Sequence, residues 1–323
     1  MLCSSYYTAY RAQRTGKPVS VWTKGNIMIV ITGATGAIGR PLVDQLSTEG
    51  AAVRAVTRDP RAAGLPAQVE VVEGDPSKPD TIADALRGAT ALFLHPRAVG
   101  DAADELAALA AELGVLRIVA LSAANVDDDL ADQPSRFRGD RNKEAEDAAV
   151  NSGLEWVSLR ASTFAVNTLH AWGDQIRAGD IVRYVYAAFE ESPIDERDLS
   201  AVAARALLTD ALVGQRLELT GPASLSHAAM VAIIGDVIGR PLRFAEIPPA
   251  AATQGMLQHG FPEPFVNALM SRYARYVDHP QHPPTGEAAR ILGRPARTYA
   301  EWVADHASAF GPASGPARAT RRP

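Results

Sequence analysis

The sequence has almost no cysteine and no long apolar run. Cys3 is the only cysteine among 323 residues, which excludes a disulfide framework and a thiolate metal site and favours a reducing cytoplasm. The histidines, among them His259, His279 and His282, have no acidic or cysteine partners at metal-ligand spacing, so we predict no metal. No apolar stretch approaches the ~20 residues that a membrane span requires, and the N-terminus lacks the apolar block of a secretory signal. We therefore predict a cytoplasmic protein without a membrane partner.

An excess of positive charge is also missing. Acidic residues outnumber basic ones, 37 to 32, for a net charge of -5, and the two signs are interspersed. Such a surface does not attract phosphate backbones, so a nucleic-acid partner is not indicated. The content of 47% hydrophobic and 21% charged residues is that of a globular chain long enough for one large or two joined domains. The sequence does not indicate an oligomeric state.

Both ends of the chain differ from the rest. Residues 1–26 carry basic but no acidic side chains and precede the natural start of a fold of this kind. We predict a disordered extension, or a start codon assigned too far upstream with Met28 as the working initiator. An organelle-targeting segment is the alternative, and Pro18 weakens it. Residues 311–323, rich in glycine, proline and alanine, are predicted to form a disordered tail.

The most informative segment is a β-branched apolar run, residues 27–32, that leads into three glycines. Gly33 allows a sharp turn off a strand, Gly36 allows backbone N–H groups to approach a diphosphate, and Gly39 allows close helix packing. The helix that follows offers unpaired donors and the positive end of its dipole to phosphates. We predict a dinucleotide site whose cofactor contacts in this turn are Gly33, Thr35, Gly36, Ala37, Ile38 and Gly39.

Strand and helix patterns alternate after this turn, which is typical of a parallel, doubly wound sheet. We therefore predict an α/β fold with a Rossmann-type core over residues 27–160. After the first strand, extended runs are expected at residues 53–57, 69–72, 91–94, 116–121 and 154–159, with helices at 79–86, 101–113 and 142–151.

The pattern loosens beyond residue 160. Residues 161–310 are predicted to form a smaller, mainly C-terminal α/β lobe that binds the substrate. The segments around 195–220 are expected to pack back on the core. Within this part we expect a strand at 181–188, a helix at 199–209 and a strand at 215–220.

The end of the second strand bears on the choice of nucleotide. Folds that prefer NAD place a carboxylate there, whereas this chain has Arg58 first and Asp59 next. A guanidinium pairs with a 2′-phosphate, so NADP(H) is preferred and NAD(H) remains possible. The alternative is an arginine solvated in a turn. Asp75 follows the third strand and would lie beside the adenine. The alternative is that its Asp-Pro pair only forms a turn.

Polar and aromatic candidates follow three later strands, where ligands bind in open α/β sheets. His95 and Ser122 are assigned to the cofactor, although a histidine before a proline is often a turn residue. Asn125, Phe164 and Asn167 are assigned to the substrate, with core packing as the alternative for the phenylalanine.

The chain resembles the atypical short-chain dehydrogenases grouped as NmrA-like or NAD(P)H azoreductase-like proteins, which include quinone and triphenylmethane reductases. The resemblance covers residues 27–310. The motifs that carry it lie at residues 31–40, 53–60, 71–75, 119–123, 143–146 with 152–154, 159–160 with Phe164 and Asn167, 195–207, 219–222 and 293–302.

The resemblance implies a role for Lys143 and shows that the catalytic tyrosine of the wider family has no counterpart in this sequence. In the wider family this lysine holds the nicotinamide ribose and lowers the pKa of a tyrosine four residues earlier. That position is Gly139 here, so Lys143 is predicted as a catalytic and cofactor-binding residue without its phenol. The alternative is a surface lysine paired with Asp147 one helical turn later. A ketoreductase that uses Tyr184 or Tyr186 as its acid is a further possibility.

The missing tyrosine narrows the chemistry. Hydride transfer to a simple ketone builds up a basic alkoxide that needs a placed acid, whereas a quinone, an azo bond or a polycyclic aromatic acceptor gives a stabilised product. We therefore predict an NAD(P)H-dependent oxidoreductase that acts on such a small-molecule acceptor. The rival prediction is an NmrA-like regulator that senses redox state by binding NAD(P) without turnover.

Overall fold

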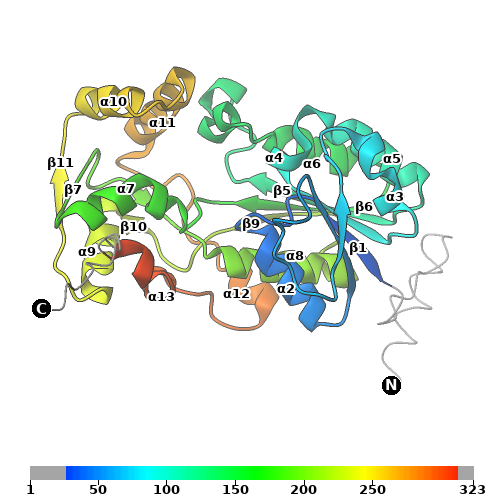
Figure 1. The fold of residues 1–323 in the computed structure, drawn as a ribbon. Helices are drawn as coiled ribbons and strands as arrows, with labels where there is room; N and C mark the ends of the chain where they lie inside the picture. Colours follow the sequence, from blue (N-terminus) through cyan, green and yellow to red (C-terminus); the bar gives the residue numbers. More distant parts are fainter. Residues whose placement is uncertain (1–26, 312–323) are drawn as a thin grey trace, which may run out of the picture.

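The computed structural model describes residues 27–311, and the predictions for residues 1–26 and 312–323 lie outside this range. Its centre is a seven-stranded parallel sheet in the order β3-β2-β1-β4-β5-β6-β9. Helices cover both faces of this sheet (Figure 1). The predicted Rossmann-type fold is therefore confirmed. The strands are β1 (Met28–Ile31), β2 (Ala52–Thr57), β3 (Glu70–Glu73), β4 (Ala91–Leu94), β5 (Arg117–Ala123), β6 (Glu155–Ala161) and β9 (Gln215–Leu219).

The two faces of the sheet bury alternate residues of the same strands, as the two-residue period of a strand requires. In β1, Ile29 and Ile31 pack on one side, and Val30 packs on the other. The side of the isoleucines is covered by α2 (Gly39–Thr48), α8 (Glu196–Leu208) and α12 (Glu287–Leu292). The opposite side is covered by α3 (Ala83–Leu86), α4 (Pro96–Val99), α5 (Ala103–Glu112) and α6 (Asn142–Asn151).

The sheet has one strand more than the sequence predicted for the core. The predicted strand at 215–220 forms β9 and pairs with β6 in parallel. Since α8 begins at Glu196, three residues before its predicted start, it covers more of the sheet. The Asp195 side chain caps this helix by accepting the backbone N–H of Arg197, a signal that apolar periodicity does not contain.

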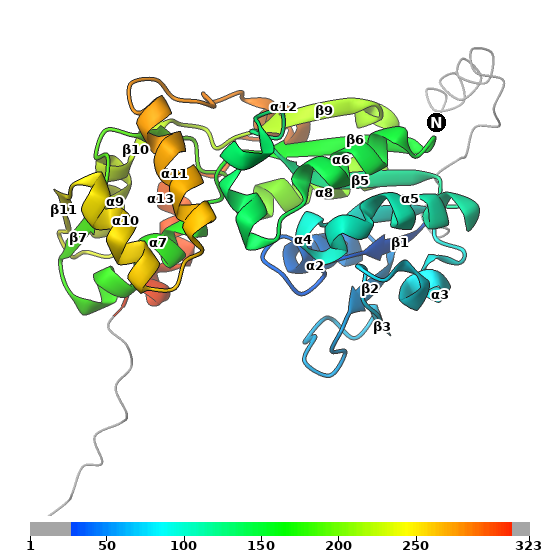
Figure 2. The same cartoon turned by 90° about the horizontal axis from the view of Figure 1, so that it is seen from above.

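A smaller lobe lies beyond the carboxyl ends of the parallel strands (Figures 1 and 2). The predicted strand at 181–188 is shorter, because it ends at Tyr184 and Tyr186 has a positive φ of 50°. The elements of this lobe are α7 (Asn167–Ala178), β7 (Ile181–Tyr184), β8 (Glu190–Glu191), β10 (Leu225–Ser226), α9 (His227–Val237), β11 (Arg243–Glu246), α10 (Pro249–Gln258), α11 (Glu263–Tyr276) and α13 (Tyr299–Asp305).

The loop after β5 joins the smaller lobe to the sheet. Arg138 lies over the rings of Phe261 and Phe265, at 6.0 and 5.5 Å from their centroids. Arg275 of α11 forms an ion pair of 2.8 Å with Asp132 in the same loop. These contacts place α11 and the turn before it against the loop between β5 and α6.

A buried carboxylate connects α6 to the far strands of the sheet. Glu146 is 2% exposed and accepts hydrogen bonds from Ser158 (2.6 Å), Arg160 (2.6 Å) and Arg216 (2.7 Å). Burial alone would raise the pKa of this carboxyl, but the hydrogen bonds from the two arginines and the serine lower it from 4.5 to about 2. The carboxylate therefore stays ionised and fixes α6 on β6 and β9.

We expect Glu146→Gln to lower the free energy of unfolding at neutral pH by about 3 kcal/mol, because it leaves two arginines without their buried counter-charge. Glu112→Gln, at an exposed position of α5, should change it by less than about 0.5 kcal/mol. The native pKa lies below the ordinary value, so the contribution of Glu146 is present above pH 4.5 and is lost as the pH falls toward 2. Denaturant unfolding at pH 7 and pH 3 measures the effect of each variant and its dependence on pH. A difference between variant and wild type that stays constant across this range would contradict the prediction.

Candidate functional site

The turn between β1 and α2 is built on close backbone contacts. A Cβ atom on Gly39 would lie 2.1 Å from the carbonyl oxygen of Gly33, and one on Gly33 would lie 2.8 Å from the ring of His95. The backbone N–H of Gly36 donates to the same Gly33 carbonyl at 3.0 Å. No other residue type fits at Gly33 or Gly39 without displacing the turn, and the first turn of α2 thus starts directly at the strand end.

A threonine holds the next strand beside this turn. The Thr32 hydroxyl donates to the carbonyl of Phe93 at 2.8 Å and accepts the backbone N–H of His95 at 2.8 Å. The His95 ring therefore packs on the glycine turn. Its Nδ1 atom is buried and has no hydrogen-bond partner within residues 27–311. Burial lowers the pKa of this imidazole, which keeps it neutral.

A second unpartnered polar atom lies at the end of the neighbouring strand. Ser122 is 2% exposed, and its Oγ makes no hydrogen bond to any residue that the structure describes. Buried polar groups are normally paired, so two unpaired ones at adjacent strand ends indicate a missing ligand. A nicotinamide ribose or carboxamide has donors and acceptors that can serve as the missing hydrogen-bond partners of His95 and Ser122. The residues at this edge therefore fit a nicotinamide dinucleotide.

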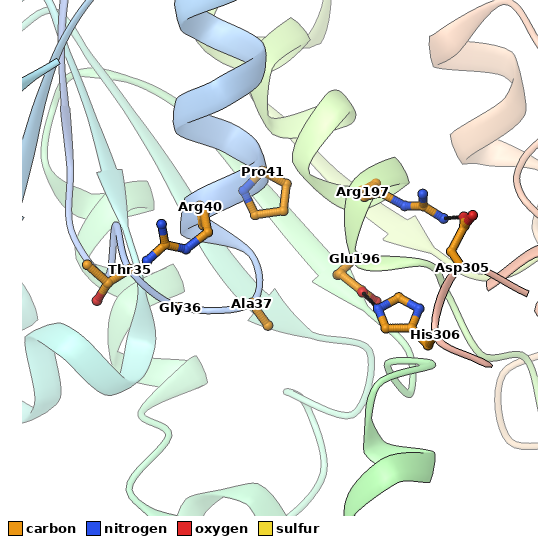
Figure 3. A pocket seen from close by; sticks show the side chains of 9 residues that line it. All are labelled: Thr35, Gly36, Ala37, Arg40, Pro41, Glu196, Arg197, Asp305 and His306. Carbon is orange, nitrogen blue, oxygen red and sulfur yellow. Dashed lines mark ion pairs between the residues drawn. The ribbon is translucent and has the colours of Figure 1, made fainter. Parts of the chain in front are cut away.

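A cavity of about 430 Å³ opens in front of the glycine turn, which is the size of a small-ligand site (Figure 3). One side is formed by the turn and the start of α2. The other side consists of residues that the sequence analysis did not identify, because they come from the start of α8 and the end of α13. The lining residues are Thr35, Gly36, Ala37, Arg40, Pro41, Glu196, Arg197, Asp305 and His306.

The loop after β2 carries two exposed arginines, Arg58 and Arg61. Arg58 is exposed and makes no hydrogen bond or ion pair within residues 27–311. Asp59, the alternative ligand for a ribose, uses Oδ1 to accept the backbone N–H groups of Arg61 and Ala62. Its carboxylate therefore supports the turn, whereas Arg58, the residue directly after β2, keeps its side chain available to a ligand.

Arg40 fixes the same loop from the other side. Its guanidinium donates to the carbonyl oxygens of Gly64 (2.7 Å) and Ala63 (2.8 Å). The loop that carries Arg58 is thus tied to the first turn of α2. Sequence reasoning missed this contact, since an arginine after a glycine turn carries no sign of which backbone it will bind.

Asp75 also supports a turn. Its Oδ1 accepts the hydroxyl of Ser77 at 2.7 Å and the backbone N–H of Ser77 at 3.1 Å. The hydroxyl hydrogen bond is the main reason that the pKa of Asp75 is lowered, with smaller contributions from Lys78 and Arg58. A contact of Asp75 with adenine remains a prediction.

Comparison with known proteins identifies the family. A family model described as NAD(P)H-binding matches residues 33–210, which is more than half of the chain. The chain belongs to the NAD(P)H-binding family. The predicted cofactor class and the azoreductase-like resemblance are confirmed, and the relatives described next make the chain an oxidoreductase, as predicted.

Two relatives match over their full length. A (4-alkanoyl-5-oxo-2,5-dihydrofuran-3-yl)methyl phosphate reductase of Streptomyces griseus is 35% identical over 287 residues, 88% of this chain and 100% of the relative. An NAD(P)H azoreductase of Xenophilus azovorans is 31% identical over 291 residues, with the same coverage of 88% and 100%. The fold matches that of an NADPH-dependent quinone oxidoreductase of Escherichia coli solved with NADPH, at a TM-score of 0.74 and 22% identity over 86% of this chain and 99% of the other.

In this NAD(P)H-binding protein, Lys143 is paired with Asp147, which is the alternative that the sequence left open. Its Nζ lies 2.6 and 2.5 Å from the two carboxylate oxygens of Asp147, one turn later in α6. The pair is about 40% exposed, at 39% and 41%, so water competes with it and the ammonium can change partners. Binding of the nicotinamide ribose by Lys143 remains a prediction.

Gly139 has a structural reason to be glycine. It follows the short 3-10 helix Pro134–Arg138 with a φ of 95°, in the left-handed region that a tyrosine rarely adopts. Tyr184 does not lie at the strand ends of the seven-stranded sheet. It lies in the core of the smaller lobe, where its hydroxyl is 3.2 Å from that of Tyr273 and burial raises its pKa to about 12.

The three substrate candidates lie in the loops after β5 and β6. Phe164 packs against the core and forms a bridge with Ile194, which favours the packing alternative. Asn125 begins a turn, since its carbonyl accepts the N–H of Asp128, and Asn167 is exposed at the start of α7. Their contact with a substrate remains a prediction.

Residues 27–311 contain no group of three or more histidine, cysteine, aspartate or glutamate residues that could hold a metal ion. In the same range, no helix has both the length and the apolar character to cross a bilayer.

We expect Gly39→Ala to lower stability by about 2–3 kcal/mol and to abolish nucleotide binding, because the added methyl group must displace the Gly33 carbonyl. Gly255→Ala is the matched control, since its Cβ meets nothing within 4 Å and alanine favours the helix by about 0.5–1 kcal/mol. Thermal unfolding and NADPH fluorescence measure both effects. Full NADPH binding by the Gly39 variant would contradict this account of the turn.

Proposed function

We propose that the protein is an NADPH-dependent reductase of quinone-like, azo or polycyclic aromatic acceptors that works without a catalytic tyrosine. The supporting observation is Gly139, whose left-handed backbone occupies the position where the wider family has its acid. When bound, the nicotinamide supplies a hydride, and the residues of this chain bind it and exclude water. The hydride reduces the acceptor by two electrons, and water supplies the proton that completes a hydroquinone or hydrazine.

The relatives support an electron-poor acceptor. The substrate named for the Streptomyces griseus reductase has a ring double bond conjugated with two carbonyl groups, and that of the Xenophilus azovorans enzyme contains an azo bond. Each accepts a hydride without forming a localised alkoxide. Such acceptors need little help from a placed acid, which agrees with the absence of a phenol four residues before Lys143.

NADPH is proposed over NADH on the basis of the loop after β2. Arg58 has no partner in the described chain, whereas Asp59 is committed to its own turn. The Arg40 contacts hold this loop in place before a ligand arrives, so an ionic contact to a 2′-phosphate needs little reordering.

Arg58→Ala should lower kcat/KM for NADPH about 10- to 100-fold and leave the value for NADH within about threefold, since only NADPH carries a phosphate at this position. Arg87→Ala, a control at an exposed arginine paired with Asp84, should change neither value. Initial rates with both nucleotides and one acceptor give the two ratios. An equal loss with NADPH and NADH would show that Arg58 does not contact the 2′-phosphate.

The purified full chain should oxidise NADPH, followed at 340 nm, when given a panel of quinones, azo dyes and conjugated lactones. Simple ketones should give rates at least about 100-fold lower, because they need an acid that this site lacks. Tight NADPH binding with no acceptor-dependent oxidation would overturn the proposal and favour a redox-sensing regulator. Efficient ketone reduction would show instead that another acid serves the site.

A further inference from the structure

The cavity at the glycine turn has a second wall made of charged residues far apart in sequence. Glu196 and Arg197 begin α8, whereas Asp305 ends α13 and His306 follows it. Figure 3 shows Glu196 and His306 in contact across the cavity from the turn residues Thr35 and Gly36. Glu196 and Arg197 fall within the family motif at residues 195–207, but the sequence assigned no role in the site to any of the four residues.

The hydrogen bonds of His306 determine which nitrogen faces the cavity wall. Its Nδ1 lies 2.8 Å from the carbonyl oxygen of Trp302, and a carbonyl only accepts, so Nδ1 carries a hydrogen. The ring stacks on the Trp302 indole at 4.4 Å between centroids and 20° between planes. The other nitrogen, Nε2, is therefore the one that lies 3.5 Å from Oε1 of Glu196.

Glu196 is an enclosed carboxyl group. It is 6% exposed, and both of its oxygens accept the Trp302 indole N–H, at 3.1 and 3.0 Å. Burial raises the pKa of this carboxyl. A carboxylate facing the lone pair of a neutral Nε2 is unfavourable, whereas one proton on either group turns the contact into a hydrogen bond or an ion pair. The Glu196–His306 pair is thus built to hold one proton.

The remaining charges on this side do not neutralise the pair. Arg197 forms ion pairs of 2.6 Å with both Asp195 and Asp305. Arg40, from α2, directs its guanidinium to two backbone carbonyls. With the pair unprotonated, the carboxylates of residues 195, 196 and 305 face two guanidiniums, and a diphosphate at the turn would add further negative charge.

We infer that the Glu196–His306 pair forms the far wall of the diphosphate site and takes up one proton when a nicotinamide dinucleotide binds. The inference rests on the proposed function only in that the dinucleotide binds at the glycine turn. Negative charge from the diphosphate stabilises the protonated pair, so the pair binds its proton more tightly in the complex. By linkage, the affinity is highest at low pH and falls as the pH rises.

Calorimetric titration of the full chain with NADPH in buffers of different ionisation enthalpy should show uptake of about one proton per nucleotide near pH 8. The dissociation constant should rise by up to about tenfold per pH unit. Measurements stay above about pH 7.5, where the 2′-phosphate is ionised. NADH, which lacks that phosphate, should show the same uptake. Proton uptake is a readout that a purely structural role for these residues would not change.

Two variants test the pair. Glu196→Gln keeps an acceptor for the Trp302 indole but cannot titrate, and it should bind NADPH at pH 8 at least as tightly as wild type, without proton uptake. His306→Gln should also abolish the uptake and serves if the Glu196 variant does not fold. His259→Gln should retain the uptake, because this histidine directly follows α10 and its Nδ1 bonds the carbonyl of Gly255 in that helix.

Two results would overturn the inference: tight NADPH binding by wild type without proton uptake, or uptake that persists in both variants of the pair. Wild-type protein that does not bind NADPH at all would instead contradict the proposed function. NADPH binding with proton uptake but no acceptor reduction would support the inference about the Glu196–His306 pair and contradict the proposed reductase function.

Discussion

The contact between the carbonyl of Gly33 and the backbone of Gly39 is the constraint on which the rest of the site depends. There is no space for a Cβ atom between them, so α2 starts directly at the end of β1. This places the amide groups of the turn at the mouth of the cavity, and it leaves room for the His95 ring beside Gly33. A looser turn would move the helix start, the neighbouring strand end and the floor of the site together.

The core and the C-terminal part are joined directly behind this turn. The Ser200 hydroxyl of α8 donates to the carbonyl of Ile38 at 2.9 Å. Two residues earlier in the helix, Asp198 is 1% exposed and binds both Arg294 and Arg297. These contacts bring the segment before α13 to the core, which positions Asp305 and His306 at the cavity. The cavity at the glycine turn is therefore shared between elements near the beginning and near the end of the described chain.

The sequence predicted the features that local chemistry determines. The Gly33 turn and the alternation of strands and helices follow from glycine spacing and apolar runs. The pairing of β9 with β6 was only partly foreseen, because pairing between distant strands depends on tertiary packing rather than on local pattern. His306 was missed for a similar reason, since nothing around it in sequence marks a position opposite Gly36. The pairing of Lys143 with Asp147 could not be chosen from the sequence, because a lysine on a flexible stem carries no local sign of which partner it will take.

The left-handed conformation of Gly139 also limits how this protein can change over evolutionary time. A tyrosine at this position would force an L side chain into a backbone region that costs about 1–2 kcal/mol, and it would do so at the end of a helical turn. A single codon change to tyrosine would therefore carry this backbone cost, although a Cβ atom at this position meets nothing within 4 Å. A lineage that gained a phenol here would have to offset that strain or relax the loop between β5 and α6.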